Sequence, residues 1–221
     1  MCGRYTLTQV GPKLVEERFQ LGDVALEPAT LGRFNVCPTE DILVVTHKGS
    51  RAVRWGLVPS WSKAVGQGPL LINARSETVA SKKVFSRLLE RPERRCLVIA
   101  DGWYEWLAPE KKGEPRVPFH YRIDGGALFA FAGLCDVAKI DGVWVPSATI
   151  LTTTANAVSA PVHDRMPVVL GGPDEEAAWM QGGDLALLAP IAAERTSAAP
   201  ANPAVNKAGV EGPEMLVAPA S

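Results

Sequence analysis

Short runs of apolar residues, many of them alternating with polar ones, recur along the first 170 residues of this chain. Runs of this length that are rich in Val, Ile, Thr and aromatic residues are typical of β-strands. They predict strands at 2–7, 41–47, 51–58, 117–123, 127–134 and 147–154, and two strands about a tight turn at Gly102 within 96–108. The tripeptides at 48–50 and 124–126 are typical hairpin connections, so we expect the strands on either side of each to pair.

Helical spacing is confined to a few segments. It predicts helices at 10–21, 76–90 and 173–180, and a helical turn at 156–160. The first helix would place Val10, Leu14 and Phe19 near one face, with Thr8 as its N-cap. The third is an acidic helix that Pro173 would start.

This pattern, with many strands, few helices and no regular alternation of the two, predicts an α+β fold. We expect a mainly antiparallel, barrel-like sheet core with a few flanking helices. The whole chain, 1–221, is interpreted as a single domain. Within it, the Ala- and Pro-rich stretch 192–204 is expected to be loosely held, and the last residues to form a tail.

Composition supports a globular protein, because 47% of the residues are hydrophobic and 21% are charged. No apolar run approaches the roughly 20 residues that a membrane-spanning helix needs, and no basic segment precedes an apolar one at the N-terminus. We therefore expect a cytoplasmic protein of bacterial type.

The four cysteines are dispersed, without a Cys-x-x-Cys pair or a His cluster, so neither a metal site, a cofactor nor a disulfide scaffold is expected. Cys37, Cys96 and Cys135 are interpreted as buried apolar residues. Cys2 differs because of its position at the terminus.

Charge is unevenly distributed. The segment 48–95 carries eleven Lys or Arg and three Glu, a net +8, whereas the rest of the chain carries twelve basic and twenty-one acidic residues, a net −9. A basic region on a nearly neutral protein suits a local contact with nucleic acid. The alternative is that about half of these charges simply solvate a helix face.

The chain begins Met-Cys-Gly, and a small second residue allows removal of Met1. Cys2 would then present a thiol and a free α-amine, whose ordinary pKa values of about 8.5 and about 8 make both nucleophilic near neutral pH. An aldehyde could form an imine with the amine, and the thiolate could close on the same carbon to give a thiazolidine ring. The alternative is that Cys2 is an accident of a frayed terminus.

Asn73, Arg75 and Glu77 occupy alternate positions at the end of an apolar run, so a strand would place them on one face. Asn73 could orient a substrate through its amide, and Arg75 could bind a phosphate. A turn followed by a helix cap at Ser76 is the structural alternative.

Glu105 stands between two aromatic residues in "GWYEW". Desolvation raises the pKa of a carboxyl group, which suits a general acid or base near neutral pH. By strand alternation, however, Glu105 shares a face with Trp103, while Tyr104 and Trp106 share the other. An exposed acid on an edge strand is the alternative.

His163 lies in the Pro-bounded segment "PVHDRMP" and is suited to proton transfer. Asp164 and Arg165 follow it directly. We expect these two to pair with each other and to fix the loop.

These segments, with "RWGLVPSW", "TTTAN" and "HDRMPVVL", occur in an order that resembles the SRAP family, the abasic-site-processing proteins. The resemblance runs from residue 1 to residue 170. It implies a protein that recognises an abasic site in single-stranded DNA, including sites at single-strand/double-strand junctions, and forms a covalent crosslink through a thiazolidine at Cys2. It also implies a role in the DNA damage response, and association with the nucleoid when bound to DNA.

Matched by motif, the resemblance makes Cys2 the nucleophile, with Asn73 and Glu105 lining the pocket. Glu105 would handle protons during opening of the sugar and closure of the ring, and His163 would stabilise the opened sugar. Lyase action on the abasic strand and self-processing peptidase activity are further activities credited to the family.

For DNA contacts, Arg4 and Arg75 are matched to flanking phosphates and Trp55 or Trp61 to neighbouring bases, where stacking contributes about 1–3 kcal/mol per base. Pro38 is matched to a wedge near the strand junction. The chain departs from the family in having Cys135 where Trp is frequent, and in having Cys37 beside Pro38.

Two other functions fit parts of the sequence. An N-terminal-nucleophile hydrolase of the glutamine amidotransferase kind also begins Met-Cys-Gly and uses its α-amine as a base. A purely non-covalent module for single-stranded or junction DNA would need only the basic segment.

Overall fold

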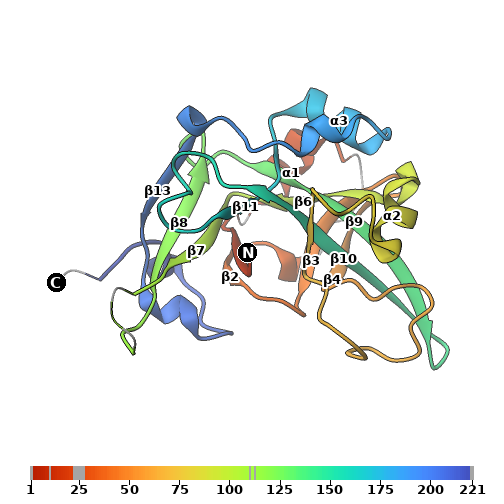
Figure 1. Ribbon diagram of the computed structural model, residues 1–221, viewed down its shortest axis with the longest axis horizontal. Helices are drawn as coiled ribbons and strands as arrows, with labels where there is room; N and C mark the ends of the chain where they lie inside the picture. Colours follow the sequence, from red (N-terminus) through yellow and green to blue (C-terminus); the bar gives the residue numbers. More distant parts are fainter. Residues whose placement is uncertain (1, 10, 22–27, 110, 112, 220–221) are drawn as a thin grey trace.

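The computed structural model describes residues 2–9, 11–21, 28–109, 111 and 113–219 of the chain. Its strands form two sheets, with three α-helices lying outside them (Figure 1). The first sheet has the strand order β13 (Thr196–Pro200), β8 (Val117–Ile123), β7 (Gly102–Leu107), β1 (Arg4–Leu7) and β2 (Arg33–Val36). Its neighbouring strands all pair antiparallel within the part of the chain that the structure describes.

The second sheet closes on itself. Its ring runs through β10 (Val143–Thr154), β4 (Gly49–Trp55), β3 (Asp41–Thr46), β6 (Arg95–Ala100) and β9 (Phe129–Ile140), and β9 pairs again with β10. Three short strands extend it, namely β5 (Asn73–Arg75), β11 (Arg165–Pro167) and β12 (Val169–Leu170). The expectation of an α+β fold with a mainly antiparallel, barrel-like core is confirmed.

The inner face of this barrel follows from the register of its strands. Directly paired residues point to the same side, and alternate residues along a strand share that side. Val44 pairs with both Val98 and Arg51, and Trp55 lies four positions beyond Arg51. Val44, Val98 and Trp55 are buried, so they fill the barrel, whereas Arg51 is exposed at its mouth.

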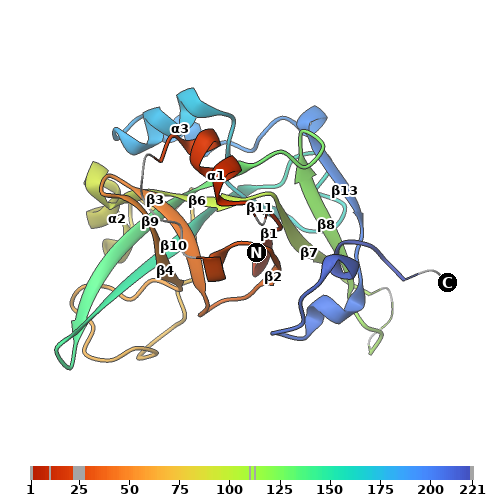
Figure 2. The same cartoon turned by 180° about the vertical axis from the view of Figure 1, so that it is seen from behind.

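The helices cover the outside of the barrel. α1 (Pro12–Phe19) and α3 (Pro173–Met180) lie together on its upper surface, and α2 (Lys83–Leu89) lies at its side (Figures 1 and 2). Arg18 and Glu176 join α1 to α3 through two hydrogen bonds, of 3.0 and 2.7 Å. Pro173 opens α3 as predicted.

The predicted helices differ in detail from those observed. α1 is capped at Gly11 rather than Thr8, and its buried residue is Val15, whereas Leu14 is 48% exposed. Val10 lies outside the described residues. The helix predicted over 76–90 is shorter, because turns occupy the chain up to Lys82.

One predicted hairpin is wrong. β8 and β9, on either side of 124–126, belong to different sheets, so this connection passes from one sheet to the other. The hairpin forms one strand later, between β9 and β10, where Asp141 and Gly142 have φ angles of 50° and 85°. An Asp-Gly pair with both φ angles positive is the favoured two-residue hairpin turn. The hairpin predicted at 48–50 joins β3 and β4 as expected.

The stretch 192–204 was expected to be loosely held, but part of it is a strand. β13 pairs with β8 from Thr196–Ile123 to Pro200–Phe119. Beyond it, Val205 and Met215 are buried in a small cluster with Tyr104. Small residues and prolines are compatible with an edge strand, and the cluster supplies the apolar contacts that a free tail would lack.

Candidate active site at the amino-terminal strand

Cys2 lies just before β1, an interior strand of the first sheet that pairs with β2 and β7. The side chain of Cys2 is fully buried and belongs to the main apolar core. Burial, and then the charge of Glu105, raise the pKa of its thiol, against an opposing effect of the positively charged amino terminus. The folded chain therefore holds Cys2 as a protonated thiol in a fixed place.

Asn73 reaches Cys2 from the other sheet. It begins β5, which pairs in parallel with β10 through Asn73–Ile150. Its Nδ2 donates a hydrogen bond of 2.7 Å to the carbonyl oxygen of Cys2. The strand geometry expected from the sequence thus brings Asn73 to the amino terminus.

Glu105 lies beside the same residue. Because Arg4 pairs with Tyr104, the next position on β7 lies against the residues that precede Arg4. Glu105 is 2% exposed, and burial raises the pKa of its carboxyl group to about 7. β7 is an interior strand between β1 and β8, so the alternative of an exposed acid on an edge strand is excluded.

His163 completes the group through its loop before β11. Burial first, and then the positive charge of the amino terminus, lower the pKa of its imidazole. Its Nδ1 lies 3.0 Å from the backbone N of Arg165 and 2.9 Å from Oδ1 of Asp164. The lowered pKa favours the neutral ring. Its Nδ1 accepts from the backbone N–H of Arg165 when the proton is on Nε2, and donates to Asp164 when the proton is on Nδ1.

Arg165 does not pair with Asp164 as expected. Its Nη1 and Nη2 each donate to a carboxylate oxygen of Glu77 at 2.9 Å, and Nη2 also donates to the Thr152 carbonyl at 2.8 Å. The hydrogen bonds of Arg165 lower the pKa of the Glu77 carboxyl group. This fork fastens the His163 loop to the segment that follows Asn73, a role that sequence reasoning missed because the two residues are 88 positions apart.

The residues predicted to contact DNA fall into different environments. Arg75 is exposed, and Trp61 is 55% exposed with the Arg87 guanidinium 5.9 Å from its ring centroid. Trp55 is fully buried inside the barrel, and its Nε1 donates to the Ile72 carbonyl at 3.0 Å. The prediction that a base stacks on Trp55 is therefore wrong. The sequence could have indicated its burial, because Trp55 lies two positions after the apolar Val53 and so shares a face of the strand with it.

Pro38 begins an ordered turn whose next residue, Thr39, has a φ of 76°. This angle is unusual for a β-branched residue. Thr39 is held there by its N–H, which donates to the Trp55 carbonyl at 2.8 Å, and by Nη1 of Arg54, which donates to the Thr39 carbonyl at 2.9 Å. Pro38 thus lies on a fixed turn beside the C-terminal end of β4.

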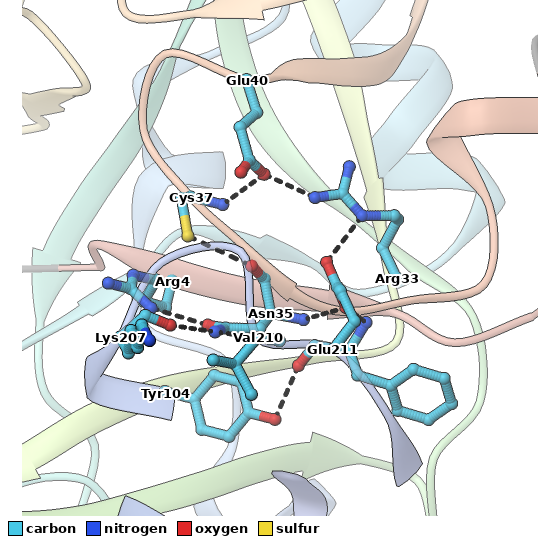
Figure 3. Close-up of polar contacts among 10 residues, drawn as sticks. Arg4, Arg33, Asn35, Cys37, Glu40, Tyr104, Lys207, Val210 and Glu211 are labelled. Carbon is cyan, nitrogen blue, oxygen red and sulfur yellow. Dashed lines mark hydrogen bonds and ion pairs between the residues drawn. The ribbon is translucent and has the colours of Figure 1, made fainter. Parts of the chain in front are cut away.

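The guanidinium of Arg4 is directed into the protein. Nη1 donates to Oδ1 of Asn35 at 2.8 Å and to the carbonyl of Val205, and Nη2 donates to the carbonyl of Asn206 at 3.2 Å. Figure 3 shows this side chain against Asn35 of β2. These contacts tie the residue two positions from Cys2 to the C-terminal segment. Phosphate binding by Arg4 remains a prediction.

Basic residues of 48–95 do not form one surface. Arg95 is 5% exposed, and it donates to the carbonyls of Leu89, Trp179 and Gly183. Arg94 forms an ion pair of 2.9 Å with buried Asp136. Part of the local excess of positive charge therefore serves packing.

Within the described ranges, no three His, Cys, Asp or Glu side chains cluster so as to hold a metal ion. The described helices are also all too short or too polar to cross a membrane.

Comparison with known proteins agrees with the motifs. The model of the SOS response associated peptidase (SRAP) family matches residues 1–208. The abasic site processing protein YoaM of Bacillus subtilis is 35% identical over 185 residues, which cover 81% of this chain and 79% of YoaM. The abasic site processing protein YedK of Escherichia coli is 30% identical over 231 residues, which cover 98% of this chain and 99% of YedK.

A crystal structure of a protein from Bacteroides thetaiotaomicron superposes with a TM-score of 0.85 over 100% of both chains, at 20% identity, and so shows the shared fold. The sequence resemblance is confirmed by these matches. This chain belongs to the SOS response associated peptidase family.

Proposed function

We propose that this protein processes abasic sites in single-stranded DNA, and that it does so by forming a thiazolidine crosslink between Cys2 and the open sugar after Met1 is removed. The proposal is supported by the relatives, which are named abasic site processing proteins. The observation that carries it is the arrangement at the amino terminus. Asn73 holds the Cys2 carbonyl at 2.7 Å beside a buried Glu105 whose pKa is about 7.

The chemistry needs a nucleophile and a proton carrier. The α-amine of Cys2 adds to the aldehyde carbon, and loss of water gives an imine. The thiol sulfur then bonds to the same carbon while its proton passes to the nitrogen, which closes the ring. Glu105 is suited to carry these protons, because a group with a pKa near the working pH both accepts and donates readily.

Asn73 and His163 would position the reactants. The amide of Asn73 fixes the Cys2 carbonyl, so the amine and the thiol keep one orientation toward the sugar. The imidazole of His163, neutral because its pKa is lowered, could accept a proton from a hydroxyl of the opened sugar.

DNA binding would use exposed groups outside this cluster. Arg75 follows Asn73 by two positions and could bind the phosphate next to the lesion. Trp61 could stack on a neighbouring base, and Pro38 on its fixed turn could separate strands at a junction. Shielding of the lesion, lyase action and self-processing that unmasks Cys2 are further parts of the proposal.

The test is incubation of the purified protein with single-stranded DNA that carries one abasic site, followed by a denaturing gel and intact-mass measurement. We expect a slow band that requires Cys2 and that is absent in Cys2→Ala and in protein that retains Met1. An equal band with Cys2→Ala would contradict the covalent step. Binding without any band would leave the non-covalent module, and release of ammonia from glutamine would indicate the amidotransferase.

A further inference from the structure

A second cysteine lies in a pocket that the amino-terminal site does not use. Of the four cysteines, Cys2, Cys37 and Cys96 are buried, whereas Cys135 is partly exposed. Cys135 lines a pocket of about 620 Å³ at the mouth of the barrel. Its lining includes neither Asn73, Glu105 nor His163.

Strand register explains why the thiol faces this pocket. Cys96 of β6 pairs with Gly133 of β9, and Cys135 follows two positions later, so all three point to the inner side of the barrel. Arg51, which pairs with Val44, points to the same side. Gly133 leaves room for the thiols, because a Cβ there would lie 2.8 Å from Sγ of Cys96.

The pocket is cationic and has an aromatic wall. Lys48, Arg51, Arg91 and Arg94 line it, with Glu93 as the one acid among its lining residues, and Trp144, 64% exposed, stands at its side. Arg91 is paired with Glu93 at 2.7 Å and Arg94 with Asp136 at 2.9 Å. The side chain of Arg51 forms no hydrogen bond or ion pair within the part of the chain that the structure describes, which leaves it for a ligand.

We propose that Cys135 is a second reactive thiol of this protein, and that its pocket admits small disulfides that carry carboxylate groups and forms mixed disulfides with them. In the step, the Cys135 thiolate attacks one sulfur of the disulfide. A bond forms between Sγ and that sulfur, the original sulfur–sulfur bond breaks, and the other half leaves as a thiolate with the electron pair.

The surroundings of Cys135 favour its thiolate. A hydrogen bond from the Cys96 thiol lowers the pKa of Cys135, and the charges of Arg94 and Arg51 also lower it, whereas burial and the charge of Asp136 raise it. The same hydrogen bond raises the pKa of Cys96. Cys135 is the attacking thiol because it is partly exposed to the pocket, whereas its hydrogen-bond donor Cys96 is fully buried.

Two aromatic disulfides, one anionic and one uncharged, test the proposal. They are used on Cys2→Ala protein so that the terminal thiol cannot contribute. Dithiobis(nitrobenzoate) carries two carboxylates, and dithiodipyridine carries none. We expect peptide mass mapping to place the first label of both reagents on Cys135. The substitution Cys135→Ser should remove this first and fastest labelling reaction.

Arg51→Gln should slow labelling by the anionic reagent by roughly three- to tenfold and slow the uncharged reagent less. Loss of the Arg51 charge reduces the thiolate for both reagents, but only the first is also attracted by the pocket. Lys13→Gln, which removes an exposed charge on α1, is the matched control and should change neither rate. If Arg51→Gln does not fold by circular dichroism, Lys48→Gln takes its place.

A first label on Cys37 or Cys96 would overturn the proposal, as would an anionic rate that is insensitive to both Arg51→Gln and Lys48→Gln. The test does not depend on DNA or on Cys2. Its failure is therefore separate from any failure of the crosslinking proposal.

Discussion

Glu105 shows how a single residue acquires its chemistry from its surroundings. Its sequence neighbours Tyr104 and Trp106 are aromatic, but they point to the other face of β7. There they pack with Val205 and Met215 from the C-terminal end of the chain. Its own face lies toward Cys2 and the core. The carboxyl group is buried by that core, and this burial raises its pKa to about 7.

Glu105 should also make stability depend on pH. Its carboxyl group loses a proton near pH 4.5 in the unfolded chain but near pH 7 in the fold, so the folded state binds more protons between these values. The contribution of Glu105 to the free energy of unfolding should fall by up to about 3 kcal/mol as pH rises through this window. Buried His120, whose pKa burial lowers to about 4, contributes in the opposite direction, so the Glu105 effect is read from the difference between wild type and a variant. Urea unfolding measured at several pH values checks this expectation.

The matched variant is Glu105→Gln, which keeps the shape and removes the titration. Its stability should gain on that of wild type as pH rises across this window, because the variant keeps the His120 contribution and loses the Glu105 one. If the crosslinking proposal holds, it should also slow crosslink formation while single-stranded DNA still binds. An unchanged pH profile in Glu105→Gln would mean that another group is responsible.

At the scale of elements, the site depends on contacts between the two sheets. β1 and β7 carry Cys2 and Glu105 in the first sheet, whereas β5 and the loop before β11 bring Asn73 and His163 from the second. Arg165 and Glu77 join the last two elements. This ion pair is partly buried, since the Arg165 side chain is 10% exposed and that of Glu77 is 45% exposed.

Arg165→Lys should loosen the His163 loop, because lysine cannot donate to both Glu77 oxygens and to the Thr152 carbonyl in the same geometry. We expect a loss of about 1–3 kcal/mol in unfolding free energy. The rate of crosslink formation should fall more than the affinity for undamaged single-stranded DNA. Arg122→Lys, an exposed position on β8, is the control and should behave as wild type.

At the scale of the whole molecule, the C-terminal segment, residues 201–219, packs against the first sheet and is hydrogen-bonded to its strands. Both views show it beside β7, β8 and β13, at the side away from α2 (Figures 1 and 2). Glu211 accepts hydrogen bonds from Nε of Arg33 at 2.8 Å, from N of Phe34 at 2.6 Å and from N of Asn35 at 3.0 Å (Figure 3). The end of the chain thus braces β2 and, through Arg4, the strand that carries Cys2.

Glu211→Ala should therefore destabilise the protein by about 1–3 kcal/mol, because three donors lose their charged acceptor. Thermal and urea unfolding would measure this, and limited proteolysis should cleave the variant first in the segment after β13. Glu214→Ala, an exposed position three residues later, should have little effect. Equal stabilities of the two variants would show that the segment is held by its apolar contacts instead.

Much of this protein is determined by local sequence. Alternation marks the strands, Pro173 starts α3, and the ordered motifs indicate the family, because period, turn chemistry and residue type act over a few positions. Cys2, Asn73, Glu105 and His163 were proposed from such signals. The wrong hairpin at 124–126 arose because a turn signal says that the chain reverses but not which strand it meets.

Tertiary structure alone decided what depends on distant contacts. Closure of the barrel placed Trp55 inside it and left Arg51 at its mouth. Packing of one sheet against the other raised the pKa of Glu105 and gave Arg165 its partner at Glu77. Burial and long-range pairing are properties of the assembled chain, since the free energy of a buried charge depends on everything that excludes water from it.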